Sequence, residues 1–333
     1  MGILIYLDQN TLSDLRQRKI DETDKREFTL LKIALKSPDV IVVYSHVTLS
    51  EIHQIPSEQY RDEHITLLDE LSAQYIEPLS RNLNNQAASD IWVAYLDNIE
   101  SNKKMGISDL MDVSQLSSRK MAGLPIEDSF DAINEKVKLV LDDLISNCEQ
   151  QLASIDVNTL DEPSKENFLN MTLQLPKLKE KSAALEAPKV DSSHTLGPKS
   201  FRDIPELKAL EITKLPVTEV VKAIESTFSN ENSNFNWRDY FDDTPQNAVA
   251  RAYSLMNWAG YHADDFDKVK KRSDRFNASN NDMQHAVCAI GVNFLLSRDN
   301  AFLKKAEACY AYINQGSIVC SPEYFLSNHC KFV

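Results

Sequence analysis

The chain has 333 residues, of which 42% are hydrophobic and 26% are charged, and its formal net charge is −14. This is the composition of a soluble globular protein, and it argues against a fibrous, collagen-like or largely disordered chain. The longest apolar runs are far shorter than the roughly 20 residues that a membrane-spanning helix needs, so no membrane association is expected. The acidity also argues against broad nucleic-acid affinity, because a generic duplex binder presents a basic face.

The cysteines and the first residues indicate a cytoplasmic protein. The five cysteines are odd in number and form no Cys-x-x-Cys pair, so neither a disulfide framework nor a structural zinc site is expected. The apolar run Ile3–Leu7 has no basic region before it and ends at an acid, which favours a strand over a signal peptide.

The first 80 residues alternate between strand and helix patterns. Ile3–Leu7 is a short apolar run that ends at Asp8, and Val40–Tyr44 is a continuous β-branched run typical of a strand buried on both faces. Helical spacing of apolar residues and a third short strand complete the pattern. The expected helices are residues 11–18, 27–36, 47–53 and 57–73, and the third strand is residues 74–78.

The last 55 or so residues repeat this alternation. We expect a helix over residues 281–290 with Asp282 at its start, a strand over 292–297, a helix over 301–310 and a final strand over 316–320. Alternation of this kind predicts an α/β fold with a parallel, doubly wound sheet.

The middle of the chain has almost no strand signal. Long amphipathic stretches predict helices there, for example over residues 126–153 and 204–228, and residues 187–202 are the best loop candidate. We therefore expect an all-α insertion domain at residues 81–274, between the two parts of a core formed by residues 1–80 and 275–333.

Four carboxylates occupy special places in this scheme. Asp8 follows the first strand, Glu51 lies on the helix after the second, Asp282 opens the C-terminal helix, and Asp299 follows the next strand. The carboxyl ends of parallel strands meet at one edge, where ligands bind. Clustered carboxylates repel each other unless a cation neutralises them, and Mg²⁺ or Mn²⁺ prefers oxygen ligands.

The segments around these acids resemble the motifs of the PIN-like nuclease family. Tyr-Leu-Asp-Gln-Asn ending at Asn10, Ser-Glu-Ile around Glu51, Asn-Asp-Met-Gln-His-Ala around Asp282 and Leu-Leu-Ser-Arg-Asp ending at Asp299 occur in the family's order. The resemblance covers residues 1–80 and 275–333 and implies a PIN-like parallel sheet flanked by helices. It also implies a metal-dependent nuclease, with all four acids both catalytic and metal-binding.

Further candidates surround the acids. Asn10 can orient Asp8 or bind a metal-bound water, and Ser297 can hydrogen-bond a phosphate or an acid. His285 lies one turn from Asp282 and can contact a metal-bound phosphate. A basic run precedes the Asp282 helix and can grip substrate phosphates. The candidate nucleic-acid contacts are Lys268, Lys270, Lys271, Arg272, Arg275 and Arg298, with Lys304 and Lys305 as an extension.

Each of these residues also has a purely structural interpretation. Asp8 and Asp282 can simply cap helices, Asp299 can be a turn residue, and Glu51 can be a solvated acid on a surface helix. His285 can pack at the boundary between helix and sheet, and the basic run can be a solvated face.

The leading functional hypothesis is an endoribonuclease that leaves 5′-phosphate and 3′-hydroxyl ends, by resemblance. RNA is favoured over DNA as the substrate by the family alone. One alternative is a structure-specific DNase. The other is a catalytically idle PIN-like module that binds a protein partner through its acidic helical insertion, as in a toxin–antitoxin or defence assembly. The oligomeric state, including a homo-oligomer, stays open.

Overall fold

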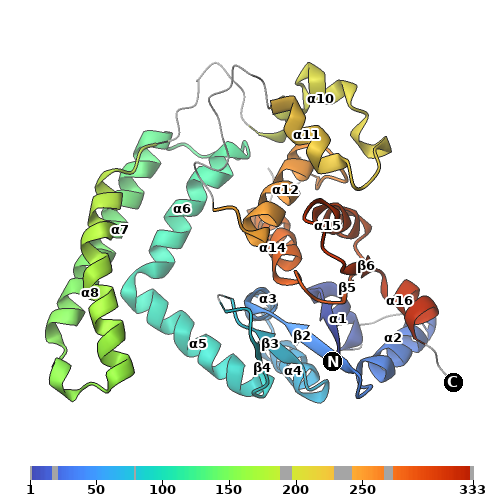
Figure 1. Ribbon diagram of the computed structural model, residues 1–333, viewed down its shortest axis with the longest axis horizontal. Helices are drawn as coiled ribbons and strands as arrows, with labels where there is room; N and C mark the ends of the chain where they lie inside the picture. Colours follow the sequence, from blue (N-terminus) through green and yellow to red (C-terminus); the bar gives the residue numbers. More distant parts are fainter. Residues whose placement is uncertain are drawn as a thin grey trace. The chain divides into compact units, whose positions relative to one another are not determined.

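The computed structural model describes residues 2–16, 22–78, 80–187, 197–228, 242–265 and 273–330. Six strands form one sheet in the order β4-β3-β2-β1-β5-β6 (Figure 1). Neighbouring strands are parallel except for the antiparallel pair of β3 and β4. The strands are β1 (Ile3–Leu7), β2 (Val40–Tyr44), β3 (Gln74–Ile76), β4 (Leu83–Asn84), β5 (Phe294–Leu296) and β6 (Ile318–Cys320). The predicted α/β class with a mostly parallel sheet is confirmed, whereas β4 lies in a region where no strand was expected.

The central strand β1 is buried on both faces over its last three residues, Ile5–Leu7, as expected of a continuous apolar run. Its register places Tyr6 beside Val43 of β2 and Leu295 of β5. These three side chains share one face and belong to one hydrophobic core. Because side chains alternate along a strand, the buried Ile5 and Leu7 point to the opposite face.

Helices cover both faces of the sheet. Helices α12, α14 and α15 pack against each other and contribute to the core that contains Tyr6, while α2 contacts β2 and α16 (Figure 1). Strand ends lead into helices through serine or aspartate caps such as Asp8, Ser45 and Asp299. The helices that follow strands closely, or pack on the sheet, are α1 (Gln9–Leu15), α2 (Glu22–Leu35), α3 (His46–His53), α4 (Glu58–Glu70), α12 (Pro245–Ala259), α14 (Ser273–Cys288), α15 (Asn300–Tyr312) and α16 (Pro322–His329).

Between β4 and α14 the regular elements of the described residues are all helical, in agreement with the expected all-α region. The predicted helix over residues 204–228 is wrong as a single element. It is divided where Glu211 adopts a positive φ of 41° and where Pro216 interrupts the chain. The elements are α5 (Ala88–Met105), α6 (Ile107–Met121), α7 (Phe130–Ser154), η1 (Val157–Thr159), α8 (Glu162–Ala183), α9 (Pro198–Arg202), α10 (Pro205–Ala209), η2 (Ile212–Lys214) and α11 (Val220–Phe228).

The chain forms two compact units, one of residues 1–95 with 198–333 and the other of residues 96–197. Helices α9 to α12 thus belong to the same unit as the sheet. The expected boundaries of the insertion, at residues 81 and 274, stay a prediction.

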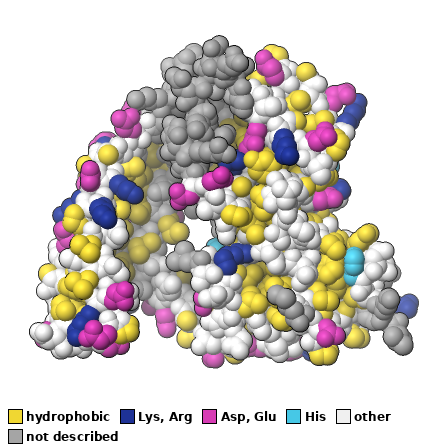
Figure 2. All heavy atoms as spheres, viewed as in Figure 1, with side chains coloured by type: hydrophobic (Ala, Val, Ile, Leu, Met, Phe, Trp, Pro, Cys, Tyr) yellow, Lys and Arg dark blue, Asp and Glu magenta, His cyan; other side chains and the backbone are white. Residues whose placement is uncertain are grey.

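The smaller unit consists mainly of α6, α7 and α8 and has little core. Only Ile133 and Ile145 of α7 are buried apolar side chains within these three helices. Large apolar side chains instead lie at the surface, among them Leu139, Leu169 and Leu173, and Figure 2 shows apolar patches over α7 and α8. Even so, no helix in the described part of the chain is long and apolar enough to cross a membrane.

Candidate active site

The carboxyl ends of β1 and β5 meet at the point where the strand order changes direction. In open α/β sheets this is the usual place for a ligand. Asp8 follows β1 and is almost completely buried, with an exposed fraction of 5%. Its carboxylate accepts hydrogen bonds from the Thr11 amide at 2.8 Å and from the Ser297 hydroxyl, after β5, at 2.6 Å. Burial raises the pKa of Asp8, and these hydrogen bonds partly offset that rise.

Glu51 is held by two side chains of α14. Asn281 donates its amide to Oε1 at 3.1 Å, and His285 donates Nε2–H to Oε2 at 2.7 Å. The other imidazole nitrogen of His285 is hydrogen-bonded to the Tyr6 hydroxyl at 2.7 Å, which is in turn bonded to Ser45 at 2.8 Å. Glu51 is therefore connected to the centre of the sheet by a buried chain of hydrogen bonds.

The pKa of His285 depends on this hydrogen bond and on the nearby acids. Burial favours the neutral imidazole, but the hydrogen bond to Glu51 and the negative charges of Glu51, Asp8 and Asp282 outweigh it, so the pKa of His285 is raised. His285 has no ring nitrogen left for the expected contact with a phosphate, because both nitrogens are already hydrogen-bonded to protein groups.

Asp282 lies on α14, one turn before His285. Its carboxyl is half-buried, and its pKa is raised to about 8, first by burial and then by the charge of Asp264, with a smaller contribution from Asp299. The prediction that Asp282 opens its helix is wrong, because α14 begins at Ser273. Asp282 is therefore an interior helix residue, so its position cannot be explained as a helix cap.

Three of the four predicted acids lie within electrostatic range of His285, and the fourth, Asp299, lies within range of Asp282. His285 experiences the charges of Asp8, Glu51 and Asp282, and Asp282 experiences that of Asp299. Two of the acids also have ordinary structural roles. Asp8 caps α1, and Asp299 caps α15 by accepting from the Phe302 amide at 3.0 Å.

The supporting and basic candidate residues differ in their burial and contacts, and the structure does not describe all of them. Asn10 is exposed in the first turn of α1, whereas Ser297 is fully buried and also accepts from the Asp299 amide at 3.0 Å. Arg298 lies near Asp14 and Glu323, at 3.6 and 3.5 Å. Four members of the basic run and the side chain of a fifth fall outside the described residues: Lys268, Lys270, Lys271, Arg272 and Arg275.

The suitability of this edge for a divalent cation can be judged from its donors. Carboxylate oxygens are what Mg²⁺ and Mn²⁺ prefer. Burial and the charges of Asp264 and Asp299 disfavour the ionised form of Asp282, so a bound cation would stabilise that form. The buried Tyr253 hydroxyl, within electrostatic range of Asp282, Asp264 and Asp299, has no hydrogen-bond partner among the described groups. The donor set therefore fits a hydrated cation in kind.

The arrangement is nevertheless not a closed cage. In the residues that the structure describes, no three His, Cys, Asp or Glu side chains are placed so that they could together hold a metal ion. Mg²⁺ commonly keeps several waters and uses only one or two protein carboxylates together with substrate phosphates. A cation here would have to be bound in that manner.

Several residues at this edge were not predicted from the sequence. Tyr6 and Asn281 complete the bonds around His285 and Glu51, and Asp264 approaches Asp282 from beyond the end of α12. Lys305 was expected to extend the surface basic track, which is wrong, because it is completely buried against Asp264. Only the tyrosine carried a local signal, as a hydroxyl within an otherwise apolar strand.

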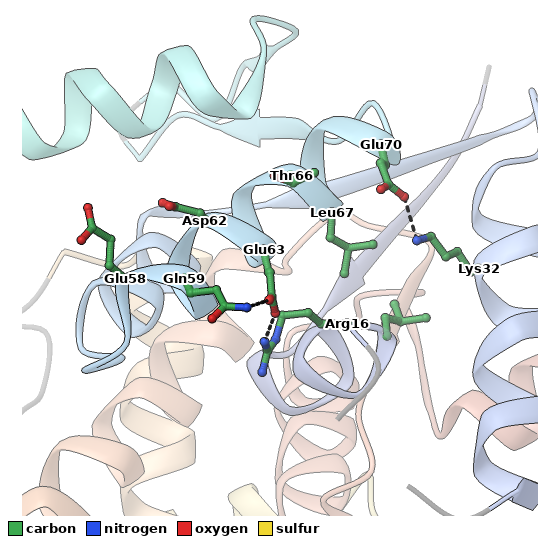
Figure 3. A pocket seen from close by; sticks show the side chains of 10 residues that line it. Arg16, Lys32, Glu58, Gln59, Asp62, Glu63, Thr66, Leu67 and Glu70 are labelled. Carbon is green, nitrogen blue, oxygen red and sulfur yellow. Dashed lines mark hydrogen bonds and ion pairs between the residues drawn. The ribbon is translucent and has the colours of Figure 1, made fainter. Parts of the chain in front are cut away.

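A separate pocket of about 590 Å³ lies between α1, α2 and α4 (Figure 3). The two cations that line it are paired with acids across its walls: Arg16 with Glu63, and Lys32 with Glu70 at 2.7 Å. None of the predicted site residues lines it. Because its cations are already neutralised, this pocket is a weaker candidate for chemistry than the carboxylate edge.

Comparison of the chain with protein-family models, curated proteins and solved structures found no match.

Proposed function

We propose that this protein is a metal-dependent nuclease with a PIN-like core, and an endoribonuclease in particular. One observation supports the proposal above all. Carboxylates from four separate elements gather at the carboxyl edge of a parallel sheet, beside the point where the strand order changes direction. The acids are Asp8, Glu51, Asp282 and Asp299.

The side chains around the acids would keep them in place for this work. Ser297 and the Thr11 amide fix both oxygens of Asp8, and Asn281 and His285 fix both oxygens of Glu51. Asp282 is the acid with the greatest need of a counter-charge, and it would hold a hydrated cation with at most one further acid, Asp8 or Asp299, and with the substrate phosphates. Mg²⁺ or Mn²⁺ supplies an activated water and stabilises the leaving oxygen of a phosphodiester.

RNA is the substrate we favour, on the resemblance alone, and a structure-specific DNase is the alternative with the same chemistry. The basic run at Lys268, Lys270, Lys271, Arg272 and Arg275, together with Arg298, would grip the substrate phosphates. The net charge of −14 limits such contacts to a local track.

A catalytically idle interaction module is the second candidate, and two observations favour it. Asp8 and Asp299 act as helix caps, and no three acids or other ligands of the described chain are placed to hold a metal ion together. The exposed leucines on α7 and α8, such as Leu139 and Leu169, would then be part of a surface for a protein partner.

The test is cleavage of a mixed RNA pool by the purified protein with Mn²⁺ or Mg²⁺. Asp8→Asn and Asp282→Asn should each lower the cleavage rate by at least about 100-fold, because each removes a proposed ligand charge. Asp112→Asn, an exposed residue of α6, is the matched control and should keep full activity.

Cleavage of matched DNA substrates distinguishes the endoribonuclease hypothesis from the DNase hypothesis. Preferential cutting of structured DNA would transfer the assignment to a DNase without changing the site. Equal cleavage by the two variants and the wild type would refute the assignment of these carboxylates. If no nucleic acid is cut, the melting temperature of the protein is measured with and without Mn²⁺. An unchanged melting temperature would refute the metal site and favour the idle module.

A further inference from the structure

Lys305 is a lysine with no solvent exposure at all, in the second turn of α15. Its ammonium group donates to Asp264 Oδ1 at 2.9 Å and lies 4.6 Å from the centre of the Tyr253 ring. The neighbouring Lys304 is the ordinary case, with 42% of its side chain exposed and Glu307 as its partner. Burying an ammonium group is costly unless it is paired, so Lys305 depends on its pairing with Asp264.

Asp264 is fixed by more than this one cation. The Asn257 amide donates to its Oδ2 at 2.9 Å, and the Ser279 hydroxyl of α14 donates to the same oxygen. Burial would raise the pKa of Asp264, but Lys305 and these hydrogen bonds hold it below its usual range. Asp264 and Lys305 therefore form a charged pair between α15, α14 and the segment after α12.

This pair lies directly beside the proposed site. Asp282 experiences the negative charges of Asp264 and Asp299 and the positive charge of Lys305. Asp264 and Asp282 thus both interact with one internal ammonium group, and Asp299 adds a further negative charge near Asp282. Because Lys305 is completely buried, it cannot reach a substrate, and any effect must act through the carboxylates.

We propose that Lys305 is a positioning residue. Its positive charge holds Asp264 and offsets the charge of Asp282, and it thereby sets how strongly this edge depends on an external divalent cation. The inference rests on the proposed function only in assigning Asp282 to the cation site. If Lys305 is removed, an added cation has more uncompensated charge to neutralise. If Asp264 loses its charge, an added cation has less.

Charge counting makes the test specific. The melting temperature is measured for each protein in EDTA and in saturating Mn²⁺, and the rise on adding Mn²⁺ is compared. The rise should be larger than that of the wild type in Lys305→Met, smaller in Asp264→Asn, and equal to it in the double variant, where the two changes cancel. Lys304→Met is the matched control and should behave as the wild type does.

In EDTA, Lys305→Met should melt roughly 5 to 15 °C below the wild type, because it leaves the half-buried Asp264 carboxylate without its cation. A merely structural role would lower the melting temperature without this ordering of the Mn²⁺ effects. Should Lys305→Met be insoluble, Asp264→Asn and the double variant still give the ordering. An equal rise in all variants would overturn the proposal while leaving the metal site intact.

If the proposed cation site does not exist, the measurements give a different result. If Mn²⁺ raises no melting temperature, including that of the wild type, the proposed cation site is wrong. The charge balance is then judged in EDTA alone, where Asp264→Asn should restore part of the stability that Lys305→Met loses. If the double variant is no more stable than Lys305→Met, the inference about Lys305 is also refuted.

Discussion

Replacing Asp282 by asparagine should stabilise the metal-free protein at alkaline pH. The pKa of Asp282 is raised from 3.8 to about 8, because burial and the nearby Asp264 disfavour its charged form. At about 1.4 kcal/mol per pKa unit, the ionised group costs the folded state at most about 6 kcal/mol. Water screens part of this half-buried carboxyl, so we expect asparagine to recover about 2–3 kcal/mol.

The sign of the pH dependence follows from proton linkage. Below about pH 4 the carboxyl is protonated in both the folded and the unfolded chain, and it has no effect on stability. As the pH rises from about 4 to 8, the folded protein keeps a proton that the unfolded chain has released, so the free energy of unfolding of the wild type falls. An asparagine side chain does not titrate, so the gain in stability of Asp282→Asn should grow over this interval and level off above about pH 8.

Urea denaturation in EDTA at about pH 4, 6.5 and 9 measures this difference. Asp112→Asn on α6 replaces an exposed acid and should differ from the wild type by less than about 0.5 kcal/mol at every pH. A gain that does not change with pH, or a loss of stability at pH 9, would refute the reasoning. The same data establish that the variant used in the cleavage assay is folded.

Two further predictions concern hydrogen bonds that hold the edge together. Ser297→Ala should cost about 1–3 kcal/mol of stability in urea titrations, because Asp8 and the Asp299 amide both lose a buried partner. The exposed Ser327→Ala is its control, and an equal effect of the two changes would contradict this role. Arg81→Ala should cost a similar amount and speed amide hydrogen exchange at the end of α14, because Arg81 donates to the carbonyls of Cys288 and Ile290 at 2.9 and 2.6 Å. Unchanged exchange there would rule out that stabilising contact.

The central elements of the sheet were predictable because their signals are local. Ile3–Leu7 and Val40–Tyr44 are continuous apolar runs, and each is followed by a polar residue that caps the next helix. The strands near the C-terminus are shorter than predicted but lie within the expected ranges. The antiparallel strand β4 is only two residues long, too short for any periodicity to reveal it.

The start of α14 was mispredicted for a physical reason. The segment from Ser273 to Asn281 is rich in serine and asparagine, which favour caps and turns over helix interiors. Tertiary contacts override this preference. Helix α14 packs against α12, Ser279 donates to Asp264, and Asn281 donates to Glu51 instead of capping its own helix.

The sequence by itself determined which acids follow strands, and hence that Asp8 and Asp299 would lie at the carboxyl edge of a parallel sheet. Only the tertiary structure decided how those charges are partnered. Lys304 and Lys305 are adjacent and chemically identical, yet one is exposed and the other is fully buried against Asp264, 41 residues away in sequence. The reason is that consecutive helix residues point about 100° apart, so the packing of α15 against distant segments sets the environment of each charge.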